Sequence, residues 1–541
     1  MKSVIQFIDM DREELNQLVE RARTSLAKED YRKVKGMAEA LTYLSELVAD
    51  QQTTIGDLRE LMFPASTEKT AAVLEKAGVA PSANGSEKTS SGKAEAQKPK
   101  PAGHGRNGAE AYRQAERVQV QHASLKHGDR CPGCQKGKVY EQQEPRQLVR
   151  IMGQAPLTAT IYALQTLRCN LCGEIYGADV PEGVGEDKYD ESAAAMIAQL
   201  KYGSGMPFYR LQDLENNLGI PLPASTQWEI VEEQAELIKP ARDELIRQAA
   251  QGEVLHNDDT GMKVLSLRRA ILEEAGERTG IFTSGVVSTR EGRKIALFFT
   301  GRQHAGENLA DVLKRRAAEL PMPIQMSDAL ARNAPTPIKL LVGNCLAHGR
   351  RHFVKITPNF PEPCRHVLEL LGEVYHHDQL ARERGLSRVE RLRFHQEHSK
   401  PVMDDLHQWL ETQLKENKVE PNSGLGKAIN YMLRHWQALT LFLRELGAPL
   451  DNNLVERALK KAILHRKNSL FYKTLNGAEV GDLYMSLIHT CELNGVNPFD
   501  YLTELQRHTE ELGAKPAQWM PWSYRDSLAR SAFRSPGQGS N

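Results

Sequence analysis

The sequence predicts an α/β protein in which a mixed sheet with a helical insertion follows a segment with two cysteine pairs and an N-terminal helical segment. Between residues 251 and 360, short apolar runs alternate with segments of helical periodicity, as in a sheet covered by helices. Upstream, two C-x-x-C pairs are typical of a structural metal site. Residues 12–62 have the apolar spacing of a long helix.

The composition is that of a globular chain with several domains. Its 541 residues are enough for three or four domains, and 40% of them are hydrophobic, so a large core can be buried. Basic residues number 70 and acidic residues also number 70, so any nucleic-acid surface must arise from local clustering rather than from net charge. Because the sequence shows neither a signal peptide nor an apolar run of about eighteen residues, we expect a cytoplasmic protein without a membrane span.

The N-terminal segment, residues 1–63, is expected to be helical. Its pattern fits a coiled coil that drives self-association, and it fits equally an amphipathic helix packed on its own domain. Residues 64–118 are rich in proline, glycine, serine and lysine, which predicts a flexible basic linker. Apolar residues occupy all but one position of a series with alternating steps of three and four, the exception being the polar Gln51. They are Val34, Met37, Leu41, Leu44, Val48, Ile55, Leu58 and Met62.

Residues 119–182 contain the two cysteine pairs, which are separated by segments with strand propensity. Each pair allows two thiolates to reach one ion from a tight turn, and two such knuckles complete a four-coordinate structural zinc site. Four independent thiols, or a redox pair, are the alternatives. The predicted ligands of this zinc ribbon are Cys131, Cys134, Cys169 and Cys172. The remaining cysteines are expected to be buried thiols, namely Cys345, Cys364 and Cys491.

The pattern changes again after the cysteine pairs. Residues 187–250 have the periodicity of helices. Residues 251–505 are expected to form the α/β domain, with three strands in EVLHNDDTGMKVL, GIFTSGVV and KIALFFTG, a helix in ENLADVLKRRA and a fourth strand in IQMSDA. A helical insertion is expected at about 360–445, and residues 506–541 form a C-terminal tail.

Three acidic residues stand out within the α/β domain. Asp258 and Asp328 each come at the end of an apolar strand, where a carboxylate is rigidly placed, and Glu456 follows DNN in the first turns of a helix. Magnesium prefers carboxylate ligands, and three carboxylates can hold the two ions that phosphodiester cleavage and strand transfer need. An aspartate at the end of a strand is common, so each of these acids alone is weak evidence for a metal site. Asp259, which follows Asp258 directly, is an alternative candidate for the first of the three carboxylate ligands.

A basic stretch follows Glu456 in the sequence. From Arg457 to Lys473 there are six lysines and arginines and no acid, an arrangement suited to a phosphate backbone. An arginine pair beside His348 could clamp phosphates or form an ordinary surface pair, and His348 could position a water or cap the strand. The predicted phosphate contacts are Arg350, Arg351, Arg457, Lys460, Lys461, Arg466 and Lys467.

Several segments resemble the insertion-sequence 66 family of bacterial transposases. DNNLVERALKKAILHRKNSLF and GAEVGDLYMSLIHTCELNGVNPFDYL resemble its C-terminal catalytic segment, HNDDTGMKVL its H-A-D-E-T strand, and NCLAHGRRHF its G-C-W-A-H-A-R-R-K-F segment. The cysteine knuckles resemble its zinc-binding domain, KYGSGMPFYRLQDL the helical segment after it, and MPW the L-P-W tail. The resemblance runs from about residue 119 to 524, and DNN-x-x-E-R and R-K-N are its most specific parts.

The resemblance implies a ribonuclease-H-like fold with a DDE triad, in which Asp258, Asp328 and Glu456 match the three acids and hold two magnesium ions. Two departures are visible: the family's D-E-T is D-D-T here, and its T-D-G-Y-like setting of the second acid is S-D-A-L here. The spacing between the second and third acids, 456 − 328 = 128, requires a helical insertion within the fold.

The function implied is divalent-metal-dependent DNA cleavage and strand transfer at insertion-sequence ends. Its partners would be double-stranded DNA, as terminal inverted repeats and target, further copies of the chain, and accessory proteins of the same element. Such a protein would associate with the nucleoid, and residues 187–250 would bind DNA or connect the domains. A catalytically inactive, transposase-derived DNA-binding protein is one alternative, favoured by the setting of Asp328. The second alternative is a different nuclease with the ribonuclease-H fold.

Overall fold

The computed structural model describes residues 70–78, most of 117–185, residues 187–274 and 278–534, and a few single positions elsewhere. The chain divides into two units, Ser82–Thr160 and the remainder, which are described separately. The heptad residues predicted to form a coiled coil lie outside the described residues. In the part that is described, no helix is both long enough and apolar enough to cross a membrane.

A five-stranded mixed sheet in the order β5-β4-β3-β6-β7 is the centre of the larger unit. β3 (Val254–Gly261) pairs antiparallel with β4 (Phe282–Arg290), which pairs antiparallel with β5 (Arg293–Gly301). On its other side β3 pairs in parallel with β6 (Ile324–Ser327), and β6 in parallel with β7 (Leu341–Asn344). The predicted α/β class is therefore confirmed, with all four expected strands present and β7 as an additional one.

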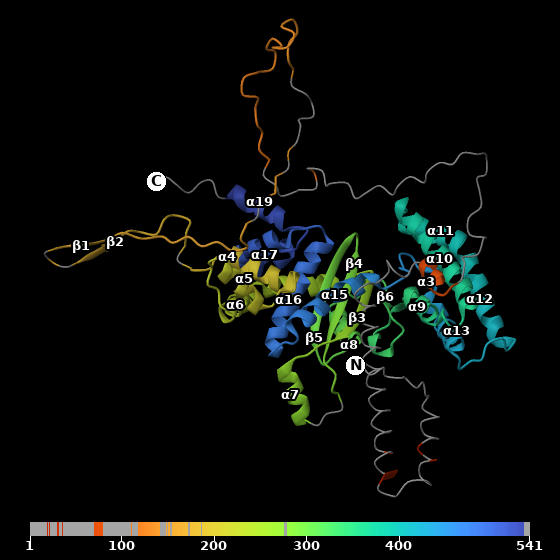
Figure 1. Cartoon of the computed structure of the whole chain (residues 1–541). Coiled ribbons are helices and arrows are strands. Elements are labelled where there is room, and N and C mark those ends of the chain that lie inside the picture. Colours follow the sequence, from red (N-terminus) through yellow and green to blue (C-terminus); the bar gives the residue numbers. More distant parts are fainter. Residues whose placement is uncertain are drawn as a thin grey trace, which may run out of the picture. The chain divides into compact units, whose positions relative to one another are not determined.

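Helices pack on this sheet from several sides (Figure 1). α15 (Asn453–Ser469) and α8 (Ala305–Leu313) both contact β3 and β4, and α16 (Leu475–Leu493) runs along β5. The helices expected at 187–250 are α4 (Glu191–Ala198), the π-helical turn Gln199–Gly203, α5 (Phe208–Asn217) and α6 (Ala224–Ala249). Of these, α6 packs against α16.

The helical insertion lies between β7 and α15. Its helices share one apolar core with the first residues of β3 and β6, Val254 and Ile324, so the insertion is anchored where these strands begin. The helices are α9 (Leu346–Ile356), α10 (Pro361–Glu383), α11 (Arg388–Phe394), α12 (Lys400–Lys415), α13 (Gly424–Arg434) and α14 (Trp436–Leu439), followed by the 3-10 turn Leu441–Leu443.

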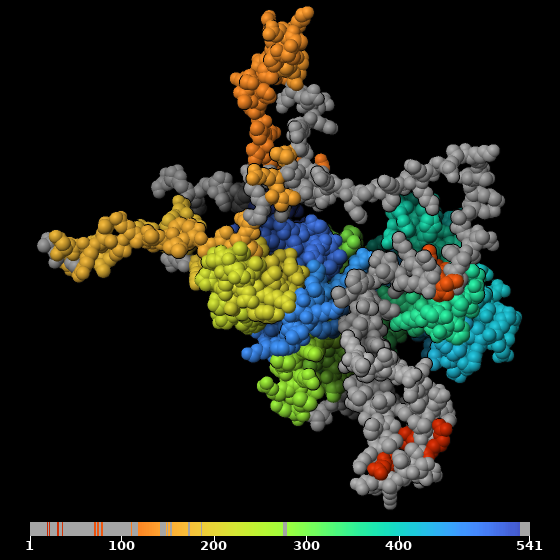
Figure 2. Space-filling view, viewed as in Figure 1, coloured from red at the N-terminus to blue at the C-terminus, as the bar shows by residue number. Residues whose placement is uncertain are grey.

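Within the segment predicted to be a linker, the described residues include a helix, α3 (Thr70–Lys76), which packs on α10 (Figure 2). Leu74 is fully buried, and the Thr70 hydroxyl lies 3.4 Å from the carbonyl oxygen of Leu368, to which it donates. The sequence TAAVLEK has good helix formers and apolar residues, whereas the proline, glycine and serine run that predicted a linker begins a few residues later.

Two further segments differ from expectation. α7 (Leu265–Glu274) lies between β3 and β4, where no helix was predicted from the sequence. The predicted C-terminal tail is largely helical and packed, since Leu512, Trp519 and Met520 within it are buried. Its elements are the end of α17 (Pro498–Arg507), α18 (Thr509–Ala514), the 3-10 turn Pro516–Trp519 and α19 (Tyr524–Arg534).

Side chains of α16 and its C-cap residue satisfy the edge strand β5. Four residues of a helix rise about 6.0 Å and two residues of a strand about 6.6 Å, so side chains four apart on a helix can match alternate residues of a strand. The edge N–H groups, which would otherwise be open to pairing with another chain, are thereby occupied. The backbone N–H donors and their side-chain acceptors are Thr300 with Asp482, Phe298 with Ser486, Ala296 with Thr490, and Lys294 with Asn494.

Removing one acceptor from this row should destabilise the fold. Ser486→Ala leaves the buried N–H of Phe298 without a partner, so we expect the free energy of unfolding to fall by about 1–3 kcal/mol. Urea denaturation followed by circular dichroism measures the loss. Ser266→Ala on the exposed side of α7 is the control and should change stability by less than about 0.5 kcal/mol. Equal stability of the two variants would show that the row contributes nothing.

Candidate active site

The three predicted acids come together at one end of the sheet. Asp258 lies on β3, Asp328 follows the last residue of β6, and Glu456 is in the first turn of α15. Because β3 and β6 are parallel and their last pair is two residues before each aspartate, Asp258 and Asp328 lie at the same level. The Asn333 amide donates to the Oδ1 of both, at 3.4 Å from that of Asp258.

Glu456 reaches this pair because α15 lies close to the sheet. Gly285 of β4 is directly opposite Asp258 in the antiparallel register. A Cβ at Gly285 would come within 3.1 Å of the Val455 and Leu459 side chains of α15. Glycine thus permits a close approach that a larger residue would obstruct, and Glu456 follows Val455 directly in the helix.

The electrostatics of Asp258 are those of a crowded acidic site. Burial, together with the negative charges of Asp328, Asp259 and Glu456, raises the pKa of Asp258 to about 7, while the Asp259 N–H opposes the rise. In the metal-free protein a proton therefore relieves the repulsion near neutral pH. A cation bound among these acids would relieve it as well.

Asp259 points to the opposite face of β3, as strand alternation requires. Its side chain is 1% exposed, with the Nδ1 of His304 at 2.9 Å and the Arg332 guanidinium at 3.3 Å. Opposite Asp259 in β4, Ser284 accepts a hydrogen bond from Asn308 of α8. The geometry therefore groups Asp258, rather than Asp259, with the other two acids.

Glu456 is held by residues of α9. Arg351 donates to its Oε2 at 3.1 Å, and the Nδ1 of His348 lies 3.6 Å from its Oε1. That Oε1 is buried and has no hydrogen-bond partner among the described residues. Lys460 lies near the same carboxylate: burial lowers its pKa, as do the charges of Arg457 and Arg351, and Glu456 opposes the change. The third acid is thus surrounded by cations.

Cys345, His348 and Glu456 also lie close enough to share an ion, with one ligand atom from each within 4.8 Å of the others. However, burial raises the pKa of Cys345 to about 12, so the sulfur is a neutral thiol, and it accepts the N–H of Asn452 at 3.2 Å. A neutral thiol is a poor metal ligand, whereas carboxylates suit a hard cation. A hard cation such as magnesium therefore suits the acidic cluster better than this set, which includes a thiol.

Some of the predicted phosphate contacts hold the fold together instead. Arg350 is buried and its guanidinium donates to the Thr70 hydroxyl at 3.4 Å, so it does not reach the surface. Lys461 donates to Glu492 at 2.9 Å and to the carbonyl of Gly203 at 3.2 Å.

The other predicted contacts fall into two groups. Arg466 donates to the Thr260 hydroxyl at 3.2 Å and to the carbonyl of Gly261, which ties α15 to the end of β3. Arg457 is exposed, and Lys460 and Lys467 are half-buried. These three are accessible to a phosphate backbone, and they lie on the helix that carries Glu456.

A group of buried polar residues behind the acids was not predicted. Its members are His256, Asn257, Gln325, Asn333 and Asn452, all at most 5% exposed. The Asn257 amide and the Gln325 amide donate to the carbonyl of Asn333 at 2.8 and 2.6 Å. The Asn452 amide donates to the carbonyl of Asn257 at 3.2 Å. Polar residues within apolar strands are the sequence signal that could have predicted this group, namely His256 and Asn257 in β3 and Gln325 in β6.

The two cysteine knuckles each form a tight turn in their own unit. In the smaller unit, an antiparallel bridge between Arg130 and Lys138 closes the first turn, and the Gly137 N–H lies 3.4 Å from the Sγ of Cys134. This hydrogen bond lowers the pKa of Cys134. In the larger unit, Cys169 lies at the end of the hairpin of β1 (Thr166–Arg168) and β2 (Ile175–Gly177). These two strands are shorter than the strand propensity of the sequence between the cysteine pairs predicted.

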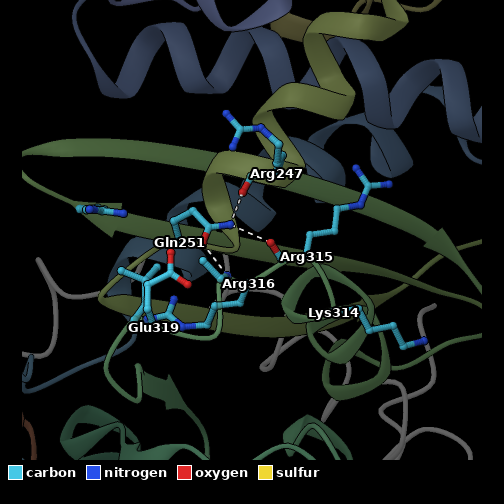
Figure 3. A pocket seen from close by; sticks show the side chains of 9 residues that line it. Arg247, Gln251, Lys314, Arg315, Arg316 and Glu319 are labelled. Atoms are coloured by element: carbon cyan, nitrogen blue, oxygen red, sulfur yellow. Dashed lines mark hydrogen bonds between the residues drawn. The ribbon is translucent and has the colours of Figure 1, made fainter.

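A surface cavity of about 470 Å³ lies away from the acids (Figure 3). It is lined by Arg247 in the last turn of α6, by residues following α6 and α8, and by Arg290 at the end of β4, where β3 begins. Gln251 bridges the carbonyls of Arg247 and Arg315 there, at 2.8 Å each. Arg316 donates to three backbone carbonyls. The cavity is therefore a structural junction at the opposite end of the strands.

The chain belongs to a family of transposases. The family model described as Transposase IS66 family matches residues 188–480, which include all three acids. Two curated relatives come from Sinorhizobium fredii (strain NBRC 101917 / NGR234): uncharacterized protein y4jD, 30% identical over 362 residues, and uncharacterized protein y4hP, 27% identical over 351 residues. The matches cover 63% and 62% of this chain, and 67% and 62% of the relatives, so the chain spans about two thirds of their length. No solved structure matches the chain.

The raised pKa of Asp258 predicts a pH-dependent stability of the metal-free protein. Because protonation favours the folded state, this group makes the free energy of unfolding fall as the pH rises from about 4 to 7. Asp258→Asn removes that penalty. With a chelator present, we expect its thermal midpoint to exceed that of the wild type at about pH 8, and the difference to shrink towards about pH 4.

Asp259→Asn is the matched control for this measurement. It weakens the pairing with His304 and Arg332, so its thermal midpoint should lie below that of the wild type at about pH 8. If Asp258→Asn also lowered the midpoint at about pH 8, Asp258 would not carry the electrostatic penalty inferred here.

Proposed function

We propose that this transposase cleaves and joins DNA by divalent-metal-dependent phosphoryl transfer, with Asp258, Asp328 and Glu456 as its catalytic carboxylates. The observation that carries the proposal is the convergence of these three acids from β3, β6 and α15, with Asn333 bridging the first two. The site lies within the segment that matches the transposase family.

The residues present suit magnesium. The donor set is made of carboxylate oxygens, the ligands that this hard cation prefers. The Oε1 of Glu456 is buried without a hydrogen-bond partner among the described residues, and burial together with the nearby negative charges raises the pKa of Asp258. When bound, two magnesium ions would activate the attacking hydroxyl and stabilise the leaving oxygen.

The chain's own residues would position the DNA. Arg457, Lys460 and Lys467 lie on the exposed side of α15 and can neutralise phosphates next to the acids. Arg351 holds the Oε2 of Glu456 and leaves its Oε1 free to face a cation. His348 lies beside that oxygen, where it can orient a water or a phosphate oxygen.

We also infer that the sheet is ribonuclease-H-like. Support comes from the strand order, in which three antiparallel strands continue into two parallel ones, and from the position of the first acid on the central strand with the second beside it. The helical insertion accounts for the long spacing between the second and third acids.

Zinc, partners and assembly belong to the same proposal. The tight turns at Cys134 and Cys169 suit thiolate ligands, which supports structural zinc bound by the four knuckle cysteines.

Double-stranded DNA at the element's ends and at the target would be the substrate. Two ends must be held together for joining, so we expect more than one copy of the chain to act, together with accessory proteins of the same element.

Conservative variants of the acids test the proposed chemistry. Asp258→Asn, Asp328→Asn and Glu456→Gln each keep the shape of the side chain but remove the charge that holds a hard cation. Each should abolish cleavage of DNA that carries the element's terminal repeats, a loss of at least about a thousandfold on a gel assay with magnesium. DNA binding in a chelator should persist, because the cations of α15 are unchanged.

Asp259→Asn is the control for the triad experiment and should retain partial cleavage, because Asp259 faces away from the other acids. Full activity of Asp328→Asn would show that the second acid lies elsewhere. A wild-type protein that binds terminal repeats but cuts them with neither magnesium nor manganese would favour the alternative of an inactive, transposase-derived DNA-binding protein.

Metal analysis tests the zinc proposal. The purified full-length chain should contain about one zinc ion per chain. Cys131→Ser or Cys172→Ser should lower both zinc content and solubility, since structural zinc contributes folding energy directly. Cys364→Ser changes a buried thiol outside the knuckles and should keep the zinc. Unchanged zinc content in the first two variants would refute the four-cysteine site.

A further inference from the structure

The turn between α15 and α16 exposes two adjacent apolar side chains. Leu470 is 62% exposed and Phe471 is 42% exposed, directly after α15 ends at Ser469. Among the described residues, the Phe471 ring makes no contact with another aromatic ring. α15 is also the helix that carries Glu456, so the pair lies at one end of an element that forms the candidate active site.

The backbone at this turn is strained. Leu470 has φ 67° and ψ −43°, and the N–H of Phe471 donates to the carbonyl of Ser469 at 2.8 Å. This is a γ-turn with positive φ at its central residue, a rare conformation that is costly for a bulky side chain. Such strain persists only where the surroundings determine the backbone, and it concentrates at functional positions.

Contacts on both sides hold the turn in place. Before it, the hydroxyl of Ser469 accepts a hydrogen bond from buried Lys201 at 2.9 Å. After it, the N–H of Tyr472 donates to the carbonyl of Lys263 at 2.8 Å, and the buried Tyr472 ring stacks on His465 with centroids 4.5 Å apart. The two apolar side chains therefore project from a rigid base.

The segments that adjoin the exposed pair carry several cations. The N–H groups of Leu265 and Ser266, at the start of α7, donate to the carbonyls of Tyr472 and Lys473, so α7 begins beside the turn. Four nearby cations are exposed and Lys467 is half-buried, and none of the five forms an ion pair within the part of the chain that is described. They are Lys263, Arg268, Arg269, Lys467 and Lys473.

A nucleic-acid strand fits this combination better than a protein surface does. Cations without acidic partners neutralise phosphates, and an exposed aromatic ring between them can stack on a base whose own partner is missing. Apolar side chains also enter between base steps where DNA is unstacked. A protein partner would have to supply several acids around a small apolar patch.

The turn lies within reach of DNA bound at the acids. Ser469 lies thirteen positions after Glu456 in α15, a rise of about 20 Å. DNA advances about 3.4 Å for each base pair, so this distance corresponds to roughly five or six base pairs.

We propose that Leu470 and Phe471 form a wedge that binds an unstacked base of the DNA, roughly five or six positions from the phosphate held at Asp258, Asp328 and Glu456. The proposal rests on the proposed function for its location, because the DNA path is defined by those acids. The wedge favours an open or distorted DNA end over a fully paired duplex. The cations around it bind both forms.

Binding of two labelled DNA probes by the full-length protein tests the wedge. One probe is a blunt duplex, and the other is the same duplex with a short unpaired fork at one end. Fluorescence anisotropy in a chelator measures both affinities. We expect Phe471→Ala to weaken binding of the fork by about 5- to 150-fold, the range for loss of one stacked base, and binding of the duplex by no more than about twofold.

Matched variants separate stacking from charge and from folding. Phe471→Trp should keep the preference for the fork, and Val389→Ala, at an exposed apolar position on α11, should bind both probes as the wild type does. Lys473→Ala should weaken both probes alike and lower the salt slope by about one unit. Leu470→Gly, which removes the strained φ, should raise the thermal midpoint and still weaken the fork.

The inference is overturned if Phe471→Ala binds the fork as tightly as the wild type does, or if it loses the same affinity for both probes. Failure of the proposed chemistry is a separate result. A wild-type protein that prefers the fork through Phe471 but does not cut DNA would remove the catalytic proposal and leave the wedge supported.

Discussion

The positions of the candidate catalytic acids depend on a group of buried amides behind them. Asn333 donates to Asp258 and Asp328 with its side chain, while its carbonyl accepts from Asn257 and Gln325. Asn452 links the start of α15 to β3. Burial lowers the pKa of His256 to about 4, so its ring is neutral and donates to Asn452 at 3.1 Å. Because each unpaired buried amide would cost about 1–3 kcal/mol, these groups favour the one arrangement that satisfies them together, and that arrangement gathers the acids.

The two faces of β3 carry aspartates in different environments. Asp258 faces α15 and contributes to the acidic cluster, and Asp259 faces α8 and is paired with His304 and Arg332. α15 in turn combines several functions, because it carries Glu456 near one end, cations along its length and the strained Leu470 turn at the other. Gly285 lets this helix approach the sheet, and α16 satisfies the edge strand beyond it. A substitution that moved α15 by a few tenths of an ångström would therefore disturb both the acids and the cationic surface.

Local patterns predicted much of the fold and failed where burial depended on distant residues. The apolar runs located β3, β4, β5 and β6 because strand periodicity is visible within a few residues. α3 was missed since the surface of α10 on which it packs lies nearly 300 residues further along the chain. Arg350 was expected to bind phosphate but is buried, because a one-dimensional pattern does not distinguish a cation that faces the protein from one that faces solvent.

The sequence by itself determined the chemistry available to this protein. Its carboxylates, its cysteine pairs and the motifs of a transposase family are all visible in the order of the residues. The tertiary structure decided which of these residues meet. It grouped Asp258 with Asp328 through the parallel register of β3 and β6, placed Asp259 on the other face, and brought Glu456 to them from 128 residues beyond Asp328 (456 − 328 = 128). The physical reason is that residue types and spacing are local properties, whereas proximity across a sheet is set by strand pairing, by helix packing and by the satisfaction of buried polar groups.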